Sequence, residues 1–497
     1  MNRRCPTHRA LAAGVAAAML ALSAQAGAGQ CFSHDRPPQQ APSGFRIAGV
    51  AEGLVSGVEL DLNRGVDQVV LEQPGAFRFT RPLRAGSAYA VEIRRHPPLT
   101  SCRVLAGNGL VLGEVDDLRV ECQLGAVTGL ATPEGAAGGT LGPLLRHADG
   151  TLYAISAEGG QHGHGGIVGI AADGNRNLLH SFADAESALA PMRLALDAAG
   201  QHLLGVTHAG GEHGGGTLYR MRVDGSNHQV LRSFGGELDS DVPSSPLLAA
   251  SDGWFYGLSA NGGPYNGGTL YRVHPDHGFQ IVHGFAQPDA LLGGQPPDAR
   301  QHDGEQGLYF PRGEMVEGGG RLYGAAVLGG RHGAGGVFEY DLRTRQLRPL
   351  ASLPRHQPPL IHGLTLGGGG ELYALSDVDS QECARVLRIG TDGSLDGWII
   401  DPRSSAIAYP QGTLAQGSDG RLYGTSVAGG RHGRGTLYVI DPRDDSVAVR
   451  FHFDRNRLDS IVGDAPRHGL LLAANGDLYG TTSSGGTTGL GAVFRID

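Results

Sequence analysis

Apolar strings of strand length, separated by short polar or glycine-rich turns, recur along most of this chain. In seven places a turn is followed by the dipeptide Leu-Tyr or a variant of it, at intervals of roughly fifty residues. Periods of this size are typical of propellers and solenoids, in which each copy buries its apolar face against the next copy. The seven positions are Leu152-Tyr153, Leu203-Leu204, Phe255-Tyr256, Leu322-Tyr323, Leu372-Tyr373, Leu422-Tyr423 and Leu478-Tyr479.

Each copy contains four candidate strands. In the third copy, SPLLAAS is followed by the pair Asp252-Gly253, then by WFYGLSA, a glycine-rich loop, GTLYRVH, a second turn and FQIVHGF. Asp-Gly and Asn-Gly pairs tolerate the positive φ of a tight hairpin turn. Seven copies of four strands predict an all-β protein with a seven-bladed β-propeller over residues 125–497, laid out like kelch blades. A solenoid is the less favoured alternative, because its end copies are usually atypical.

The seventh copy has only three strands before the sequence ends at Asp497. The segment AVTGLAT (Ala126–Thr132), ahead of the first copy, has the length of a strand. We expect it to pair with the last strand of the seventh copy and to close the ring, since an exposed sheet edge promotes aggregation.

Residues 45–124 have a different pattern, of short alternating strands such as VELDL, AFRFT and AYAVEI. This pattern predicts a small β-sandwich and resembles the Ig-like β-sandwich modules of exported bacterial proteins, which implies a spacer or adhesion module. Cys102 and Cys122 stand on neighbouring strands of this module, so they are the expected disulfide pair. Cys31 and Cys383 are either free or joined across domains.

The N-terminus predicts export. Residues 1–26 combine a basic start, an apolar run and the small-residue site Ala24-Gln25-Ala26, which is the pattern of a cleaved signal peptide. Residues 27–44 form a Pro-rich linker. Gln30 is a poor fit before a lipidated cysteine, so we expect a soluble secreted or periplasmic protein without a transmembrane segment, and not a lipoprotein.

One family carries the same repeat. The string QGSDGRLYGTSVAGGRHGRGTLYVI (Gln416–Ile440) closely resembles the GloVer tandem repeat of exported bacterial "choice-of-anchor" proteins. The resemblance implies an exported propeller and supplies no catalytic motif. Copy five departs most from the repeat, because SDVDSQECARVL replaces the glycine-rich loop.

Composition excludes some functions. The formal charge of −9 argues against a nucleic-acid partner, because phosphate binding requires concentrated positive charge. All 40 basic side chains are arginine, which excludes Schiff-base chemistry and the phosphate-binding lysine of a P-loop. The repeated tyrosine of the second strand is more typical of core packing than of a carbohydrate platform.

Two groups of residues are candidate metal ligands. His162, His213, His332 and His432 occupy equivalent places in the glycine-rich loops, where a ring of imidazoles could bind a divalent metal. A repeated structural hydrogen bond is the favoured alternative. Asp377 and Asp379 in copy five offer oxygen ligands of the kind that calcium takes, but a solvated acidic loop fits better, because the turn glycine and distal glutamate of a calcium loop are absent. No cofactor is predicted.

The long interval between copies three and four holds an insertion, Ala286–Gly318. Long loops on a regular scaffold are often functional, so the predicted ligand-binding face comprises Asp298, His302, Asp303 and Glu305 with the nearby His332. A tolerated surface loop without a role is the alternative.

The sequence favours a non-enzymatic, monomeric binding module whose ligand is an extracellular glycan, peptide or surface protein. The alternatives are a propeller enzyme, a lyase or hydrolase, that acts on an extracellular polymer at the channel mouth, and a purely structural surface-layer protein. Fold alone does not separate these classes.

Overall fold

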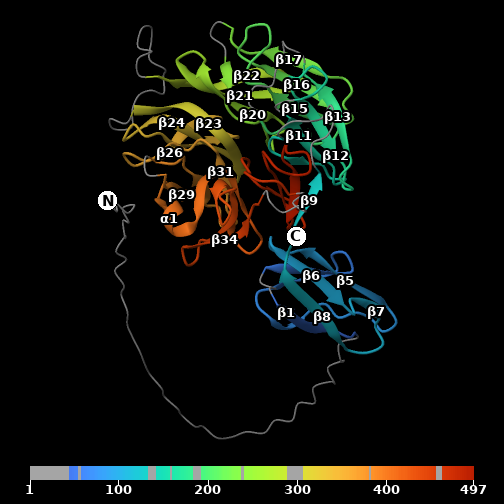
Figure 1. Ribbon diagram of the computed structural model, residues 1–497. Coiled ribbons are helices and arrows are strands. Elements are labelled where there is room, and N and C mark those ends of the chain that lie inside the picture. Colours follow the sequence, from blue (N-terminus) through green and yellow to red (C-terminus); the bar gives the residue numbers. More distant parts are fainter. Residues whose placement is uncertain are drawn as a thin grey trace, which may run out of the picture.

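The computed structural model describes residues 44–53, 57–131, 141–156, 159–182, 192–236, 240–287, 306–379, 382–454 and 462–496. The architecture is all-β (Figure 1), and the single helix among these residues is the one-turn α1 (Pro402–Ser405). The predicted signal peptide and linker lie outside the described residues. Within the described part, no helix has the length and apolar character needed to cross a membrane.

The repeat region forms seven antiparallel sheets among the described residues, which we number one to seven in chain order. Sheet three has five strands and the others have four. Sheet one contains β10 (Leu145–Arg146), β11 (Leu152–Ser156), β12 (Gly166–Ile170) and β13 (Arg176–Ser181); sheet two contains β14 (Ala195–Leu196), β15 (His202–Val206), β16 (Thr217–Arg222) and β17 (Gln229–Ser233); sheet three contains β18 (Ser240–Pro243), β19 (Leu248–Ala249), β20 (Phe255–Gly262), β21 (Asn266–His274) and β22 (Gly278–Ala286). Sheet four contains β23 (Gln306–Gly318), β24 (Arg321–Gly330), β25 (Gly336–Asp341) and β26 (Gln346–Ser352); sheet five contains β27 (Leu364–Leu366), β28 (Leu372–Leu375), β29 (Ala384–Ile389) and β30 (Leu395–Ile400). Sheet six contains β31 (Ile407–Gln416), β32 (Leu422–Gly429), β33 (Thr436–Asp441) and β34 (Ser446–His452); sheet seven contains β35 (Leu471–Leu472), β36 (Leu478–Thr481), β37 (Val493–Ile496) and β9 (Val127–Ala131).

The repeated Leu-Tyr-Gly string has a packing explanation. In sheet six, Gly424 lies under the ring of Tyr438 on the next strand, and a Cβ at this glycine would lie 2.5 Å from the ring. The tyrosine of the same string is buried and donates its hydroxyl to the turn aspartate, as Tyr423 does to Asp419 at 2.9 Å. The motif therefore fixes the hairpin and the inter-strand packing at the same time, which confirms that the tyrosine is a core residue.

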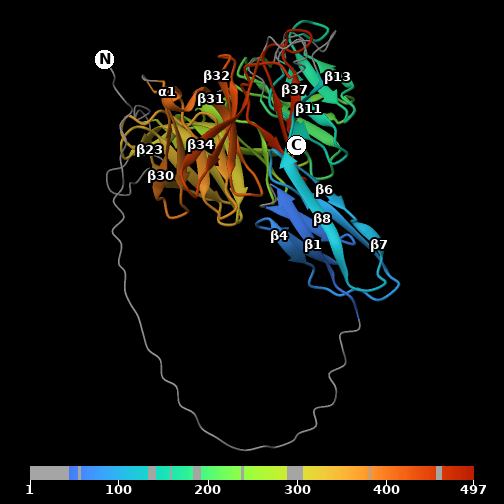
Figure 2. The ribbon, with the colours of Figure 1, turned by 60° about the horizontal axis from the view of Figure 1, so that its bottom comes forward.

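Apolar clusters join each sheet to the next. The two middle strands of a sheet are buried on both faces, as in β32 and β33, so each sheet requires a neighbour on either side. The cluster between sheets seven and one contains Tyr479 and Val493 from one and Leu152 and Val168 from the other, so the series closes on itself. Figures 1 and 2 show the resulting propeller-like arrangement.

The ring closes as the sequence predicts. Strand β9 pairs antiparallel with β37, with Ile496 opposite Val127 and Val493 opposite Ala131. The first and last parts of the repeat region therefore share sheet seven, and its edge is covered.

The segment ahead of β9 forms two further sheets, which we call the N-terminal module. Their strand orders are β4 (Gly75–Arg78), β1 (Ile47–Gly53), β8 (Val115–Leu124), β6 (Thr100–Leu105), and β3 (Asp67–Leu71), β2 (Val58–Leu62), β5 (Ala88–Arg95), β7 (Asn108–Leu110). The two sheets share one apolar core, and β1 pairs with β8 in parallel. The predicted disulfide between Cys102 and Cys122 is confirmed, joining residues opposite each other on β6 and β8. Cys383 is also disulfide-bonded.

The N-terminal module docks on the repeat region through the loop between β5 and β6. Leu99 of this loop is buried in the core shared by sheets six and seven, beside Tyr423 and Leu478. Its backbone is left-handed, with φ of 63°, a conformation that is unfavourable for leucine and that the surrounding packing must hold.

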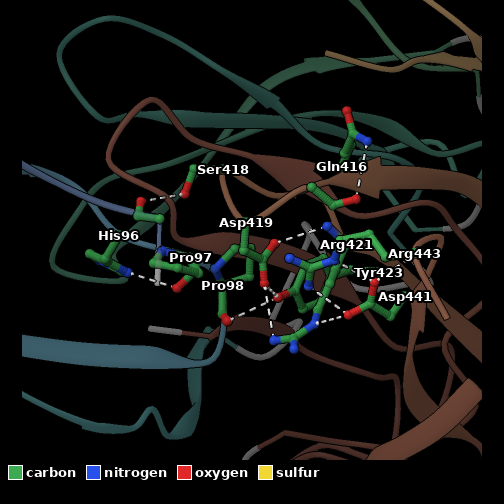
Figure 3. Close-up of polar contacts among 12 residues, drawn as sticks. His96, Pro97, Pro98, Gln416, Ser418, Asp419, Arg421, Tyr423, Asp441 and Arg443 are labelled. Carbon is green, nitrogen blue, oxygen red and sulfur yellow. Dashed lines mark hydrogen bonds and ion pairs between the residues drawn. The ribbon is translucent and has the colours of Figure 1, made fainter. Parts of the chain in front are cut away.

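Polar contacts reinforce the docking (Figure 3). The Tyr423 hydroxyl lies 3.3 Å from the Pro98 carbonyl. The amide of His96 also donates to the Asn475 carbonyl at 3.1 Å. A Cβ at Gly476 would lie 1.7 Å from the carbonyl oxygen of His96, so this turn accepts the module only because it carries glycine. The two parts of the chain are therefore in close contact.

One expectation about the insertion is wrong. Residues 306–318 do not belong to a loop but form β23, the first strand of sheet four, which pairs with β24 over most of its length. The pair Asp303-Gly304, shortly ahead of the apolar string GLYF, was a usable signal for the start of this strand. The true interval between β22 and β23 is therefore shorter than predicted.

The docking loop should contribute to the stability of the whole protein. We expect Leu99→Ala to lower the free energy of unfolding by about 3 kcal/mol, because it leaves a cavity in the core between sheets six and seven. Leu112→Ala is the matched control, since Leu112 is 83% exposed and its truncation should change stability by less than about 0.5 kcal/mol. Urea unfolding measures both, and equal stabilities of the two variants would contradict the docking.

Candidate functional site

A cleft of about 1080 Å³ lies where the N-terminal module meets sheets five, six and seven. Its walls are the turns that join the first and second strands of these sheets and the turn between β33 and β34. Tyr373 of β28, Arg388 of β29 and Arg95 from the end of β5 complete them. The cleft is therefore built jointly by the module and the repeats. We call it the junction cleft; its polar lining side chains are Arg95, Glu371, Tyr373, Arg388, Gln416, Ser418 and Arg443.

The turn of sheet five leaves space for the cleft because it has no side chains. It reads Gly367-Gly368-Gly369-Gly370, where sheet six has Gly417-Ser418-Asp419-Gly420. A Cβ at Gly368 would meet only the Gln416 side chain, whereas one at Gly367 or Gly369 would run into the Glu371 carboxylate, which lies over the turn. In sheet six the corresponding place is occupied by Asp419 and covered by Pro98 of the module, whose Cδ would lie 2.6 Å from a Cβ at Gly417.

The loss of the turn aspartate frees the amide of Glu371, whereas the amide of Asp419 in sheet six, like that of Gly369, has no acceptor among the described residues. In sheet six, Asp419 accepts from the amide of Arg421 at 3.1 Å. In sheet five, Gly369 stands in place of that aspartate, and the amides of Gly369 and Glu371 have no acceptor among the described residues. Two backbone N–H groups are thus available at the edge of the junction cleft.

Three guanidinium groups line the junction cleft. Arg443 binds Asp441 through Nε at 2.8 Å and Nη2 at 2.6 Å, and these hydrogen bonds raise the pKa of Arg443 (Figure 3). Arg388 donates through Nη2 to Asp396 at 2.5 Å. Arg95 Nη1 lies 3.5 Å from Glu59 Oε1. Each arginine is held by a carboxylate that is not part of the cleft lining, and each keeps N–H groups that these contacts do not use.

Tyr373 and Glu371 form the remaining charged or ionisable part of the lining. The Tyr373 hydroxyl donates to Glu371 Oε1 at 2.9 Å, replacing the bond to the missing turn aspartate. Burial, together with this carboxylate, raises the pKa of Tyr373 to about 12. Tyr373 therefore stays protonated at neutral pH and serves to orient Glu371.

A second polar group lies where the first strands of the sheets approach one another. Arg193 Nη2 lies 3.0 Å from Glu314 Oε2, although these residues belong to sheets two and four. The backbone of Glu314 is bridged to Gly363, next to His362. Gly412 of the sixth sheet donates its amide to His362 Nδ1 at 3.4 Å. We call Arg193, Glu314 and His362 the central cluster.

Two enclosed histidines stay neutral at neutral pH. Burial lowers the pKa of His362 to about 4, with Arg312 lowering it further and Asp377 opposing the shift. Burial likewise lowers the pKa of His468 to about 4, and Arg467 adds to this effect. The two histidines occupy equivalent places in copies five and seven, in the strings HGLTL and HGLLL.

The predicted ring of histidines does not form a metal site among the described residues. His162, His213, His332 and His432 lie on exposed tips of their loops, and His432 Nε2 is 3.6 Å from Asp454. No group of three or more His, Cys, Asp or Glu side chains in the described part of the chain is placed to hold a metal ion. The glycine-rich loops are instead held by hydrogen bonds between glycine backbones, such as Gly435 N to Gly429 O at 3.2 Å.

The other predicted residues are only partly described. Asp298, His302, Asp303 and Glu305 lie outside the described residues, so the structure does not test them. Asp377 accepts a hydrogen bond from the amide of Val378 at 2.8 Å, and Asp379 accepts from the amide of Cys383 at 3.0 Å. Both carboxylates therefore cap their own loop.

Sequence reasoning missed the junction cleft and the central cluster. The run of four glycines in copy five was a usable signal, because it departs from the Asp-Gly or Asn-Gly turn of most other copies. The repeated His-Gly-Leu string in copies five and seven was another. The ion pair between Arg193 and Glu314 had no sequence signal, since it joins two copies that are not adjacent.

Comparisons with known proteins give a family and a set of distant structures. A sequence model described as the Gloeobacter/Verrucomicrobia repeat matches residues 113–310 and 363–497. No curated protein matches the chain. Similar solved structures include a catalytically inactive virginiamycin B lyase from Staphylococcus aureus with quinupristin, at 12% identity and a TM-score of 0.47, covering 75% of this chain and 99% of that one. Oligogalacturonate lyase in complex with manganese is 11% identical with a TM-score of 0.46, covering 83% and 98%. TolB from Acinetobacter baumannii is 12% identical with a TM-score of 0.35, covering 64% and 66%.

The two enclosed histidines predict a loss of stability in mild acid. Their pKa is lowered in the folded state, so between about pH 6.5 and about pH 4 the unfolded chain binds protons that the folded chain does not. Going from about pH 7 to about pH 5 should cost about 2 kcal/mol per histidine. The double variant His362→Gln and His468→Gln should therefore lose about 4 kcal/mol less than the parent over this interval. Urea unfolding at both pH values measures the difference, and equal losses would contradict the assignment.

Proposed function

Because the chain belongs to the Gloeobacter/Verrucomicrobia repeat family, we propose that it is an exported, non-enzymatic binding protein that holds its ligand in the junction cleft. In this proposal residues 125–497 form a seven-bladed β-propeller, residues 45–124 form an Ig-like module, and residues 1–26 are a signal peptide. The ligand is an extracellular glycan, a peptide or part of a surface protein.

The observation that carries the proposal is the shared construction of the junction cleft. Its volume of about 1080 Å³ is comparable to that of pockets that bind small molecules or short oligomers. Arg95 of the module and the turns of three successive sheets converge on it. Ligand sites often lie where two domains meet, because each domain can supply part of the lining.

The chemistry of the lining favours binding over catalysis. Tyr373 has a pKa of about 12, so its hydroxyl is not a base at neutral pH. Hydrogen bonds to Asp441 raise the pKa of Arg443, which therefore remains a cation. Groups with these pKa values donate hydrogen bonds and fix charge, whereas a general acid or base requires a pKa near the working pH.

The disulfide supports export. Cys102 and Cys122 are paired within the N-terminal module, and such bonds persist in oxidising compartments. An extracellular polymer, peptide or surface protein would be accessible to a protein released there. The proposed working surface is the junction cleft, while a role for Asp298, His302, Asp303, Glu305 and His332 stays a prediction.

Screening purified protein against arrays of glycans and peptides tests the proposal. Ala474→Trp should weaken any specific hit at least about tenfold, because Ala474 is an exposed residue of the cleft wall and the indole would fill the space. Leu112→Trp is the control, since Leu112 is 83% exposed on the module and outside the cleft lining.

Product release should be followed in the same assays. Binding that Ala474→Trp leaves unchanged would place the site elsewhere on the molecule. Reproducible cleavage of a polymer would replace the binding protein with the alternative, an extracellular lyase or hydrolase.

A further inference from the structure

We propose that the junction cleft recognises an oxyanion, a carboxylate or sulfate group, on its ligand. This inference rests on the proposed binding function and adds the chemical class of the ligand. The groups that would bind the oxyanion are the amides of Gly369 and Glu371 and the guanidinium groups of Arg388 and Arg443.

The free amides are the first argument. A hydrogen-bond donor without an acceptor is costly once a ligand excludes water from it, so free amides at the edge of a cleft are suited to an acceptor supplied by the ligand. In sheet three the Asp252 carboxylate accepts from the backbone amide of Trp254 at 3.1 Å, and in sheet six the Asp419 carboxylate accepts from the backbone amide of Arg421 at 3.1 Å. A carboxylate thus satisfies the equivalent amide in other copies of the repeat. In sheet five the Glu371 carboxylate lies close to that place but accepts from neither amide, so a carboxylate or sulfate of the ligand can accept from them at the edge of the cleft.

The guanidinium groups are the second argument. Arg443 uses Nε and Nη2 to bind Asp441, and Arg388 uses Nη2 to bind Asp396, so both keep other N–H groups available. The carboxylates that hold them are not part of the cleft lining, whereas Arg95, Arg388 and Arg443 are. Three cations against the one carboxylate of Glu371 make the lining net positive, although the formal charge of the chain is −9. Arginine binds planar oxyanions through paired hydrogen bonds.

The size of the cleft indicates a group on a larger molecule. A volume of about 1080 Å³ far exceeds one carboxylate or sulfate. Gln416 and Ser418 line the same space and offer both donors and acceptors. We therefore expect an acidic oligosaccharide as the occupant, because its hydroxyl groups match these polar side chains.

Binding of hexasaccharides by isothermal titration calorimetry tests the class of ligand. The probes are a sulfated heparin hexasaccharide, a carboxylated hyaluronan hexasaccharide and neutral maltohexaose, with hexaglutamate as an acidic peptide. At least one acidic hexasaccharide should bind more than tenfold tighter than maltohexaose, and its affinity should fall as salt is raised, since charged contacts are screened. Tighter binding of hexaglutamate than of either acidic sugar would overturn the choice of a glycan.

Gly369→Asp tests the site directly. It gives sheet five the aspartate that sheet six carries, which should satisfy the free amide of Glu371 and add negative charge to the cleft. Gly369 has no positive φ, and the atom that its Cβ would meet is the flexible end of Glu371, so the substitution should fold. Binding of the acidic hexasaccharide should weaken at least tenfold.

Gly113→Asp is the matched control. It adds the same charge in the turn between β7 and β8, outside the cleft lining, where a Cβ would meet nothing within 4 Å. The affinity of Gly113→Asp for the acidic hexasaccharide should equal that of the parent. Arg388→Gln is a second test should Gly369→Asp fail to fold. The variant should fold, since the ion pair of Arg388 with Asp396 is exposed and contributes little to stability. It should weaken binding at least threefold, because it removes one of the cations of the cleft lining.

The outcomes separate this inference from the proposed function. Binding of a neutral glycan that Ala474→Trp blocks and Gly369→Asp leaves unchanged would overturn oxyanion recognition and retain the binding cleft. Failure of every acidic probe to bind would also overturn it. Unchanged affinity in both Gly369→Asp and Arg388→Gln would show that the oxyanion is bound elsewhere.

Discussion

The two middle strands of each sheet in the repeat region are buried on both faces, and this constraint governs the rest of the molecule. A sheet of this kind is stable only between two neighbours, so the series must close. Closure depends on β9, which comes from the other end of the repeat region and pairs with β37. Because β8 of the module leads into β9 through Gly125 and Ala126 alone, closing the ring also fixes where the module emerges.

The docked module and the glycine turn of sheet five together account for the junction cleft. The loop from His96 to Leu99 lies against sheets six and seven, with Leu99 in their shared core. Beside it, the four turn glycines of sheet five carry no side chains, and the Glu371 carboxylate lies over the turn. One turn of the repeat region thus receives the module, and its neighbour stays open with free amides and arginines around it. An otherwise regular scaffold acquires a distinctive site in this way.

The sequence predicted the elements that depend on local chemistry. Asp-Gly turns, the Leu-Tyr-Gly strings, the closing strand and the pairing of Cys102 with Cys122 follow from hairpin geometry and strand neighbours. The docking of the module could not be read in this way, since Leu99 is one apolar residue in a loop and its partners lie more than three hundred residues away. The predicted ligand-binding face rested on the insertion between copies three and four, and its residues Asp298, His302, Asp303 and Glu305 lie outside the described residues. The glycine-rich loops use their glycines for backbone hydrogen bonds.

The junction cleft exists only if the N-terminal module is docked, and hydrogen exchange at His96 tests this docking most directly. The amide of His96 donates to Asn475 across the contact between the module and sheet seven. Pro97 and Pro98 carry no amide hydrogen, so a peptide that spans this loop reports chiefly on His96 and Leu99. The docked arrangement predicts that this peptide exchanges as slowly as the core strand β36. Exchange as fast as that of an exposed loop would contradict the docking and, with it, the junction cleft.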